Sequence, residues 1–275
     1  MFLPILEYLA ESFGPLRIFN YFTFRAILAT LTSLVFILFF GKTFIRFIAK
    51  QKYGQIIRDE GPQSHLEKKG TPTMGGLLIL FSIVFSCLCW GDLSNKYLLA
   101  SMGVTFLFGV IGLIDDFLKL RYSNSKGLSG RSRLLWEILV ALSASSLIYY
   151  FATSAEETTL FLPFFKDFAL QLGIWFVLFS ALVLVATANA VNLTDGLDGL
   201  AIMPSVMVAA GMGIIAYISG NAILSDYLNV PYLFYSTEIV IFCVSLFGAG
   251  IVFFWCNIYL AQIFLSGVGA LSFES

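Results

Sequence analysis

The segment Asp115-Asp116-Phe117-Leu118-Lys119 places three charges directly after a long apolar run. On a helix, Asp115 and Lys119 share a face at spacing i,i+4, whereas Asp116 points about a third of a turn away. Carboxylates hold hard cations such as Mg²⁺, and a lysine neutralises phosphate oxygens. One interpretation is therefore a magnesium and phosphate site. The alternative is a set of polar residues at a helix end, joined by a salt bridge, that marks a membrane interface.

A second polar motif, Asn-Ala-Val-Asn-Leu-Thr-Asp-Gly-Leu-Asp-Gly-Leu-Ala, runs from Asn189 to Ala201. Asn192, Asp195 and Asp198 recur every three residues, so a helical turn would place them on one side. The glycines between them allow close approach to a ligand, and a helix that starts here would favour an anion. Asn, Asp and Gly are also ordinary turn residues. A linker does not need two carboxylates at helical spacing, so we favour a functional role.

The third motif is the stretch Lys-Lys-Gly-Thr-Pro-Thr-Met-Gly-Gly from Lys68 to Gly76. Its Gly-Thr-Pro-Thr part predicts a rigid turn with hydroxyl and backbone N–H groups for phosphate or nucleotide contacts. The alternative is that the two lysines only anchor a membrane helix. We assign no function to His65 or to the four cysteines. Glu137 is an acid within an apolar run, and a salt bridge with Arg133, four residues before it, is sufficient to explain its presence there.

The composition indicates a membrane protein. Of 275 residues, 59% are hydrophobic and 12% are charged, with a mean hydropathy of +0.88, whereas a soluble domain has about 25% charged residues. Seven apolar runs have the length of a membrane span, which is about 20 residues. They are Phe24–Phe44, Thr73–Trp90, Tyr97–Ile114, Leu134–Thr153, Leu170–Ala188, Leu200–Ser219 and Ile239–Cys256. We expect an all-α fold, a polytopic membrane helical bundle of about seven transmembrane helices with the start of an eighth, preceded by an interfacial helix within residues 1–21.

Basic residues in the short loops predict the orientation of the bundle. The first-to-second and third-to-fourth loops contain Arg46, Lys50, Lys52, Arg58, Lys68, Lys69, Lys119, Arg121, Lys126, Arg131 and Arg133. The loops of opposite parity contain Lys96 and Lys166. Because positive charge marks the cytoplasmic side, we expect the N-terminus outside and the three motifs facing the cytoplasm. A net charge of −1 points to no particular charged partner.

Four strings of the sequence resemble the bacterial phospho-N-acetylmuramoyl-pentapeptide transferases, within the superfamily of polyprenyl-phosphate N-acetylhexosamine-1-phosphate transferases. They are Phe22–Ala26 (FTFRA), Gly70–Gly76 (GTPTMGG), Asp115–Lys119 and Asn189–Ala201, in the order that the family has. The paired aspartates and a looser form of the last motif are shared by the superfamily. GTPTMGG together with NLTDGLDGLA is typical of the muramoyl branch, and the resemblance covers essentially the whole chain.

The resemblance implies an Mg²⁺-dependent enzyme of peptidoglycan synthesis in the bacterial inner membrane. It would move phospho-N-acetylmuramoyl-pentapeptide from uridine diphosphate to undecaprenyl phosphate, giving lipid I and uridine monophosphate. By position, the catalytic and metal-binding residues would be Asp115, Asp116 and Asp195. The substrate-binding residues would be Lys68, Thr73, Lys119, Asn192, Gly196, Leu197, Asp198, Asn257 and Phe264. The expected partners are these two substrates and the lipid bilayer. We expect no nucleic-acid partner, and the sequence leaves open whether the protein forms a homodimer.

The end of the chain departs from the family pattern. Gly267 stands where the family has a magnesium-binding Asp, and Leu260 and Ala270 stand where it has Pro and Ser. Because glycine has no ligand oxygen on its side chain, the alternative is an impaired relative that only binds the lipid carrier or the nucleotide. We expect residues 1–275 to form a single integral membrane transferase-like domain that lacks the family's C-terminal helices. A transporter is disfavoured because the spans have almost no ionisable residue at mid-depth.

Overall fold

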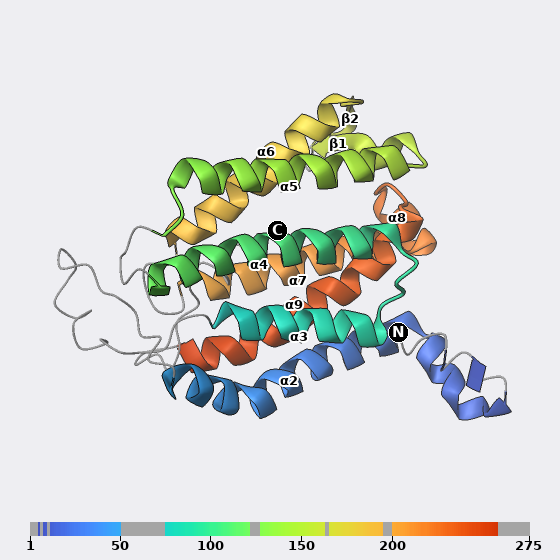
Figure 1. The fold of residues 1–275 in the computed structure, drawn as a ribbon. Helices are drawn as coiled ribbons and strands as arrows, with labels where there is room; N and C mark the ends of the chain where they lie inside the picture. Colours follow the sequence, from blue (N-terminus) through green and yellow to red (C-terminus); the bar gives the residue numbers. More distant parts are fainter. Residues whose placement is uncertain are drawn as a thin grey trace.

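The computed structural model describes residues 5, 8, 9, 12–50, 75–121, 127–162, 165–194 and 200–257. A helix occupies most of the described part of each of the seven predicted runs. These helices are α2 (Phe22–Lys50), α3 (Gly76–Trp90), α4 (Lys96–Arg121), α5 (Gly130–Phe151), α6 (Trp175–Thr194), α7 (Ile202–Ser219) and α9 (Thr237–Asn257). The prediction of an all-α polytopic membrane bundle is therefore confirmed (Figure 1).

Within the described residues, six of these helices, all except α3, are long and apolar enough to cross a membrane. The helix α3 has 15 residues. At 1.5 Å per residue it is about 22 Å long, which is shorter than the roughly 30 Å hydrocarbon core of a bilayer. Its N-terminal end adjoins residues 71–74, which lie outside the described part of the chain.

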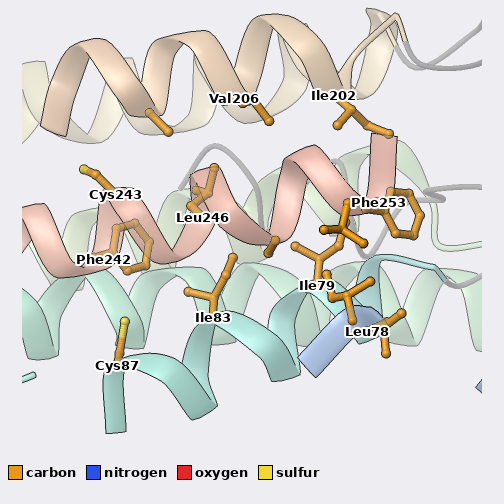
Figure 2. Close-up of a cluster of buried hydrophobic side chains, with 14 of the residues drawn as sticks. Leu78, Ile79, Ile83, Cys87, Ile202, Val206, Phe242, Cys243, Leu246 and Phe253 are labelled. Atoms are coloured by element: carbon orange, nitrogen blue, oxygen red, sulfur yellow. The ribbon is translucent and has the colours of Figure 1, made fainter. Parts of the chain in front are cut away.

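The helix α9 lies at the centre of the main packing unit, in contact with α2, α3, α4 and α7. Figure 2 shows Leu246 of α9 between Ile83 of α3 and Val206 of α7. Phe253, also on α9, is fully buried in the same cluster. Because α9 touches helices on several sides, it is apolar around most of its circumference, as expected for a helix inside a bundle.

Serine hydroxyls connect α2, α3 and α9 within this unit. Ser82 Oγ donates to the carbonyl oxygen of Ser33 at 2.8 Å, and Ser86 Oγ donates to that of Ala29 at 2.7 Å. Ser245 Oγ of α9 donates to Ser86 Oγ at 2.9 Å. Small residues allow membrane helices to approach closely, and their hydroxyls find partners across the interface. These contacts explain why serines occupy fully buried positions in apolar helices.

The helices α5 and α6 form a second unit, which packs on the main one through α4. Ala141 and Ala144 of α5, and Ala181 and Ala188 of α6, are buried against each other and against Phe108 of α4. Alanine at these positions brings the helix backbones close together. The position of α6 relative to α4 therefore depends on how α5 packs between them.

The connection from α5 to α6 contains a hairpin that the apolar pattern did not predict. After the 3₁₀ segment η3 (Ala155–Thr158), strands β1 (Thr159–Leu162) and β2 (Phe165–Gln171) pair in antiparallel register. The prediction of a helix starting at Leu170 was therefore wrong, because an apolar strand has the same hydropathy as the start of a span. Gly173, with φ +52°, lies in the turn between β2 and α6. A positive φ of this kind favours glycine.

Three further elements complete the described part. A 3₁₀ helix η1 (Gly14–Asn20) occupies part of the region where an interfacial helix was predicted. The short helix α8 (Ala222–Leu228) and the 3₁₀ turn η4 (Phe234–Ser236) connect α7 to α9. None of the three is long enough to cross a membrane.

The described residues of the three polar motifs lie at one end of the bundle. The C-terminal ends of α2, α4, α6 and α9 and the N-terminal ends of α3, α5 and α7 lie together, at the left of Figure 1. We call this the Asp115 end. The described residues that flank 51–74 and 195–199 also lie there. The sequence prediction that the motifs share one face is consistent with this arrangement.

The opposite end, which we call the Arg25 end, contains a buried ion pair. Arg25 Nη2 of α2 lies 2.6 Å from Glu238 Oε1 of α9, and both side chains are about nine-tenths buried. Arg25 Nη1 also donates to the carbonyl oxygen of Trp90, and the N–H of Asp92 donates to Glu238 Oε2. The pair therefore connects α2 and α9 with the turn between α3 and α4.

Candidate functional site

Two carboxylates and one lysine lie together at the C-terminal end of α4. The side chains of Asp115 and Asp116 are 5% and 9% exposed. Lys119 Nζ lies 2.5 Å from Asp115 Oδ2 and 3.8 Å from Asp116 Oδ1. The predicted i,i+4 pairing of Asp115 with Lys119 is confirmed, and the same ammonium also faces the second carboxylate. Carboxylates are ligands that hard cations prefer, so the two acids have the chemistry of a cation site.

The connection between α4 and α5 folds back onto Asp115. The backbone N–H of Leu128 donates to Asp115 Oδ1 at 2.7 Å. The preceding Gly127 has φ +45°, and a Cβ there would lie 2.3 Å from Asp115 Oδ1 and 2.8 Å from Lys119 Cε. Glycine is thus required at this position both by the backbone conformation and by the close approach.

The paired acids have the chemistry of a magnesium site. Mg²⁺ prefers oxygen ligands, and proteins usually bind it through one or two carboxylates, with substrate phosphates and waters completing the octahedron. Asp115 and Asp116 could supply these carboxylates. Within the described residues, no group of three or more His, Cys, Asp or Glu side chains is close enough to hold a metal ion. Asp115 and Asp116 by themselves supply the one or two carboxylates that such a magnesium site uses.

A second polar cluster joins α5 to α6 at the same end of the bundle. Arg133 Nε donates to Glu137 Oε1 at 2.8 Å. The other oxygen of Glu137 accepts a hydrogen bond from Asn189 Nδ2. With its amide oxygen turned toward the guanidinium, Asn192 accepts from Arg133 Nη1 and Nη2, each at 3.2 Å. Both asparagines of the second motif thus contact the same acid–base pair of α5.

The structure describes part of the predicted site. Asp115, Asp116 and Lys119 are in contact with one another, and Asn192 lies on the last turn of α6. Asn257 is the final residue of α9, at the same end of the bundle. The remaining predicted residues are Lys68, Thr73, Asp195, Gly196, Leu197, Asp198, Phe264 and Gly267, and they lie outside the described residues.

Sequence reasoning gave no role to Asn189 and explained Glu137 by its salt bridge alone. The salt bridge of Glu137 with Arg133 is confirmed, but the contacts of Glu137 and Arg133 with the asparagines of α6 were missed. The available signal was the spacing of Asn189 and Asn192, which places both amides on one face of a helix. Which helix that face meets depends on tertiary packing, so the spacing alone does not identify the partner.

A groove of about 570 Å³ lies between α4 and α5, lined by mostly apolar residues such as Gly103, Leu107, Ala144 and Leu147. It begins at Lys96 and Tyr97, at the Arg25 end. Leu107 is the lining residue of α4 closest in sequence to the acids, and it is eight residues, or roughly 12 Å, before Asp115. Asp115 and Asp116 are not among the lining residues, so we do not assign this groove to the polar site.

Two family models match the sequence. The model of glycosyl transferase family 4 matches residues 98–273, which is more than half of the chain. The match includes the Asp115 pair, both asparagines of α6 and residues 195–199. Signature 1 of phospho-N-acetylmuramoyl-pentapeptide-transferase matches residues 68–80, from the third motif into α3.

Proposed function

Because the chain belongs to glycosyl transferase family 4, we propose that it moves phospho-N-acetylmuramoyl-pentapeptide from uridine diphosphate to undecaprenyl phosphate. The products are lipid I and uridine monophosphate. The family and the signature at residues 68–80 make the chain a phospho-sugar transferase of the phospho-N-acetylmuramoyl-pentapeptide type. The specific substrates, the inner-membrane location and the cytoplasmic orientation are part of the proposal.

The observation that carries the proposal is the buried pair Asp115–Asp116 with Lys119 at one helix end. Phosphoryl transfer requires little covalent chemistry from the protein, so catalysis depends on positioning and on charge neutralisation. Two carboxylates that can hold a cation, beside a lysine that can contact a phosphate, are the groups that this chemistry needs. Their position at the end of a spanning helix suits a reaction between a soluble nucleotide and a lipid phosphate.

In the proposed reaction, an oxygen of the lipid phosphate attacks the phosphorus that carries the sugar. The bond from that phosphorus to the bridging oxygen breaks, and uridine monophosphate leaves with the electron pair. Asp115 or Asp116 accepts the proton when the lipid phosphate arrives protonated. Lys119 offsets negative charge on the phosphate oxygens. Asp115 and Asp116 would hold an Mg²⁺ ion, which would supply further neutralisation of the negative charge on phosphate.

The N–H of Leu128 and the ammonium of Lys119 both contact Asp115. Both contacts restrict the direction of its carboxylate. We assign the proton-accepting role to the pair as a whole, because Lys119 contacts both carboxylates.

The test is transfer of the phospho-sugar to undecaprenyl phosphate in detergent, with and without Mg²⁺. Formation of lipid I that requires Mg²⁺ and is lost in Asp115→Asn supports the proposal. Absence of lipid I from the folded chain and also from Gly267→Asp would contradict it.

The alternative function is binding of the nucleotide or the lipid carrier without transfer. Gly267 favours it, because the family's metal-binding Asp is absent at that position. Under this alternative, the chain binds a uridine nucleotide in calorimetry but produces no lipid I, and Gly267→Asp restores some transfer.

A further inference from the structure

The carboxylate of Glu137 is fully buried, and it lies outside the acid pair of the proposed reaction. We propose that Glu137 is a positioning residue, which fixes the side chain of Asn192 and the last turn of α6 where residues 195–199 begin. The inference rests on the proposed function for its kinetic test. The contacts that carry it are independent of that function.

The first contact fixes the guanidinium of Arg133. Glu137 Oε1 accepts from Arg133 Nε at 2.8 Å, on the same helix at spacing i,i+4. Because this contact uses Nε of Arg133, the terminal nitrogens Nη1 and Nη2 can contact a different helix. Both terminal nitrogens lie 3.2 Å from the amide oxygen of Asn192. The planar fork of an arginine holds one oxygen in a defined place in this way.

The second contact reaches α6 directly. Asn189 Nδ2 donates to the second carboxylate oxygen of Glu137, and it also donates to the carbonyl oxygen of Val185 at 2.9 Å. One carboxylate of α5 therefore determines the placement of two amides of α6, one through Arg133 and one directly. Asn189 and Asn192 are three residues apart, so these contacts define the rotation of the last helical turn.

A salt bridge that only neutralised a buried charge would not need α6. A buried carboxylate in a membrane helix is costly unless it is paired, and Arg133 already provides the pairing. The additional contacts both go to the second motif, three and six residues before Asp195. These contacts fix the last turn of α6, which ends at Thr194, directly before Asp195 in the sequence. Mispositioning by about 1 Å can lower a catalytic rate a hundredfold.

The test compares Glu137→Gln with Glu238→Gln. Both variants neutralise a buried glutamate that pairs with an arginine, but Glu238 lies at the Arg25 end, away from the motifs. At a temperature at which both variants stay folded, we expect Glu137→Gln to lower kcat/KM for the uridine nucleotide at least tenfold. We expect Glu238→Gln to change it less than threefold.

The double variant Glu137→Gln/Asn192→Ala separates positioning from a general loss of stability. If Glu137 acts by fixing the turn that carries Asn192, the losses of kcat/KM in the two single variants do not multiply in the double variant. Losses of kcat/KM that multiply would show that the two residues act independently, and they would overturn the inference. Equal losses in the two glutamate variants would overturn it as well.

Hydrogen–deuterium exchange provides a test that needs no turnover. Glu137→Gln should raise exchange in peptides covering residues 189–200 at least threefold, whereas Glu238→Gln should leave these peptides unchanged. If wild-type protein produces no lipid I and exchange still responds in this way, the proposed function fails while the positioning role stands. Unchanged exchange in Glu137→Gln overturns the positioning role.

Discussion

The hydroxyl of Tyr97 donates a hydrogen bond to the carboxylate of Glu157 and so joins α4 to η3 at the Arg25 end. The same carboxylate accepts from Thr153 Oγ1 at 2.7 Å and lies 3.3 Å from Lys96 Nζ. Glu157 therefore connects the start of α4 to the segment that follows α5. The hairpin β1–β2 begins two residues later and is held near the bundle by these contacts.

Acid should weaken this connection. Burial by itself raises the pKa of Glu157, but hydrogen bonds from Tyr97 and Thr153 and the charge of Lys96 outweigh it and lower the pKa. The stabilisation is present above the ordinary glutamate pKa of about 4.3 and is lost as pH falls through the lowered folded-state pKa. We expect the midpoint temperature in detergent to fall below about pH 4, and to fall less in Glu157→Gln. The exposed neighbour Glu156 provides the control, since Glu156→Gln should leave the wild-type pH profile unchanged.

Gly127→Ala should disrupt the acid pair. The added Cβ would approach Asp115 Oδ1 to 2.3 Å, in a backbone conformation with φ +45°. A left-handed conformation costs a non-glycine residue roughly 1–2 kcal/mol, and the clash displaces the Leu128 N–H from Asp115. We expect a loss of transfer rate of at least tenfold. Gly130→Ala, three residues later and with no atom within 4 Å of the added Cβ, should keep the wild-type rate. Equal rates in the two variants would contradict the role of the close approach.

Gly248→Ala should destabilise the contact between α9 and α2. A Cβ at Gly248 would lie 2.5 Å from both the carbonyl oxygen of Thr30 and Ser33 Oγ. Overpacking of this kind costs about 1–3 kcal/mol, so the midpoint temperature in detergent should decrease. The matched change is Gly211→Ala on α7, where no atom lies within 4 Å. Alanine is a better helix former than glycine, and this control should be neutral or stabilising.

Arg25→Ala should leave Glu238 buried without its charge partner. Removal of one member of a buried pair costs about 3–5 kcal/mol. We expect the midpoint temperature of unfolding to decrease by at least roughly 5 °C. The exposed Arg17 of η1 is the control, because Arg17→Ala removes the same charge without breaking a buried pair. A decrease of the same size in Arg17→Ala would show that net charge, and not the ion pair, determines stability.

Asp115→Asn and Asp116→Asn should each abolish turnover while the protein keeps its size-exclusion profile. Each change removes one negative charge beside Lys119 and one potential magnesium ligand. Lys119→Ala should lower the rate less, roughly ten- to a hundredfold, because it removes one of several groups that neutralise phosphate charge. Full turnover in both asparagine variants would refute the assignment of the acids.

Local geometry explains which parts of the site could be predicted from the sequence. The Asp115–Lys119 pair depends only on helical spacing, and the structure confirms it. The apolar runs predicted the helices because length and hydropathy determine what can cross a bilayer. The contact of Leu128 with Asp115 requires a positive φ at Gly127 and a particular return of the chain, and no periodic pattern encodes either of these.

The contacts of Glu137 with α6 depend on how two helices cross, so the sequence predicted only its partner on α5. The hairpin β1–β2 was missed because its apolar residues have the same hydropathy as the span that follows them. The roles of Asp195 and Asp198, and of the lysine and threonine in the third motif, stay predictions. They depend on segments outside the described residues.

The pair Arg25–Glu238 joins residues that are 213 positions apart in the chain. Ribosomes add about 5–20 residues per second, so Arg25 is made roughly 10–40 s before its partner. During that interval the chain does not yet contain Glu238, the carboxylate that Arg25 contacts in the folded structure. The contacts of α2 with α9, including this ion pair, can therefore form only after α9 has been synthesised. The order of synthesis thus makes α9 the helix that completes assembly of the main packing unit.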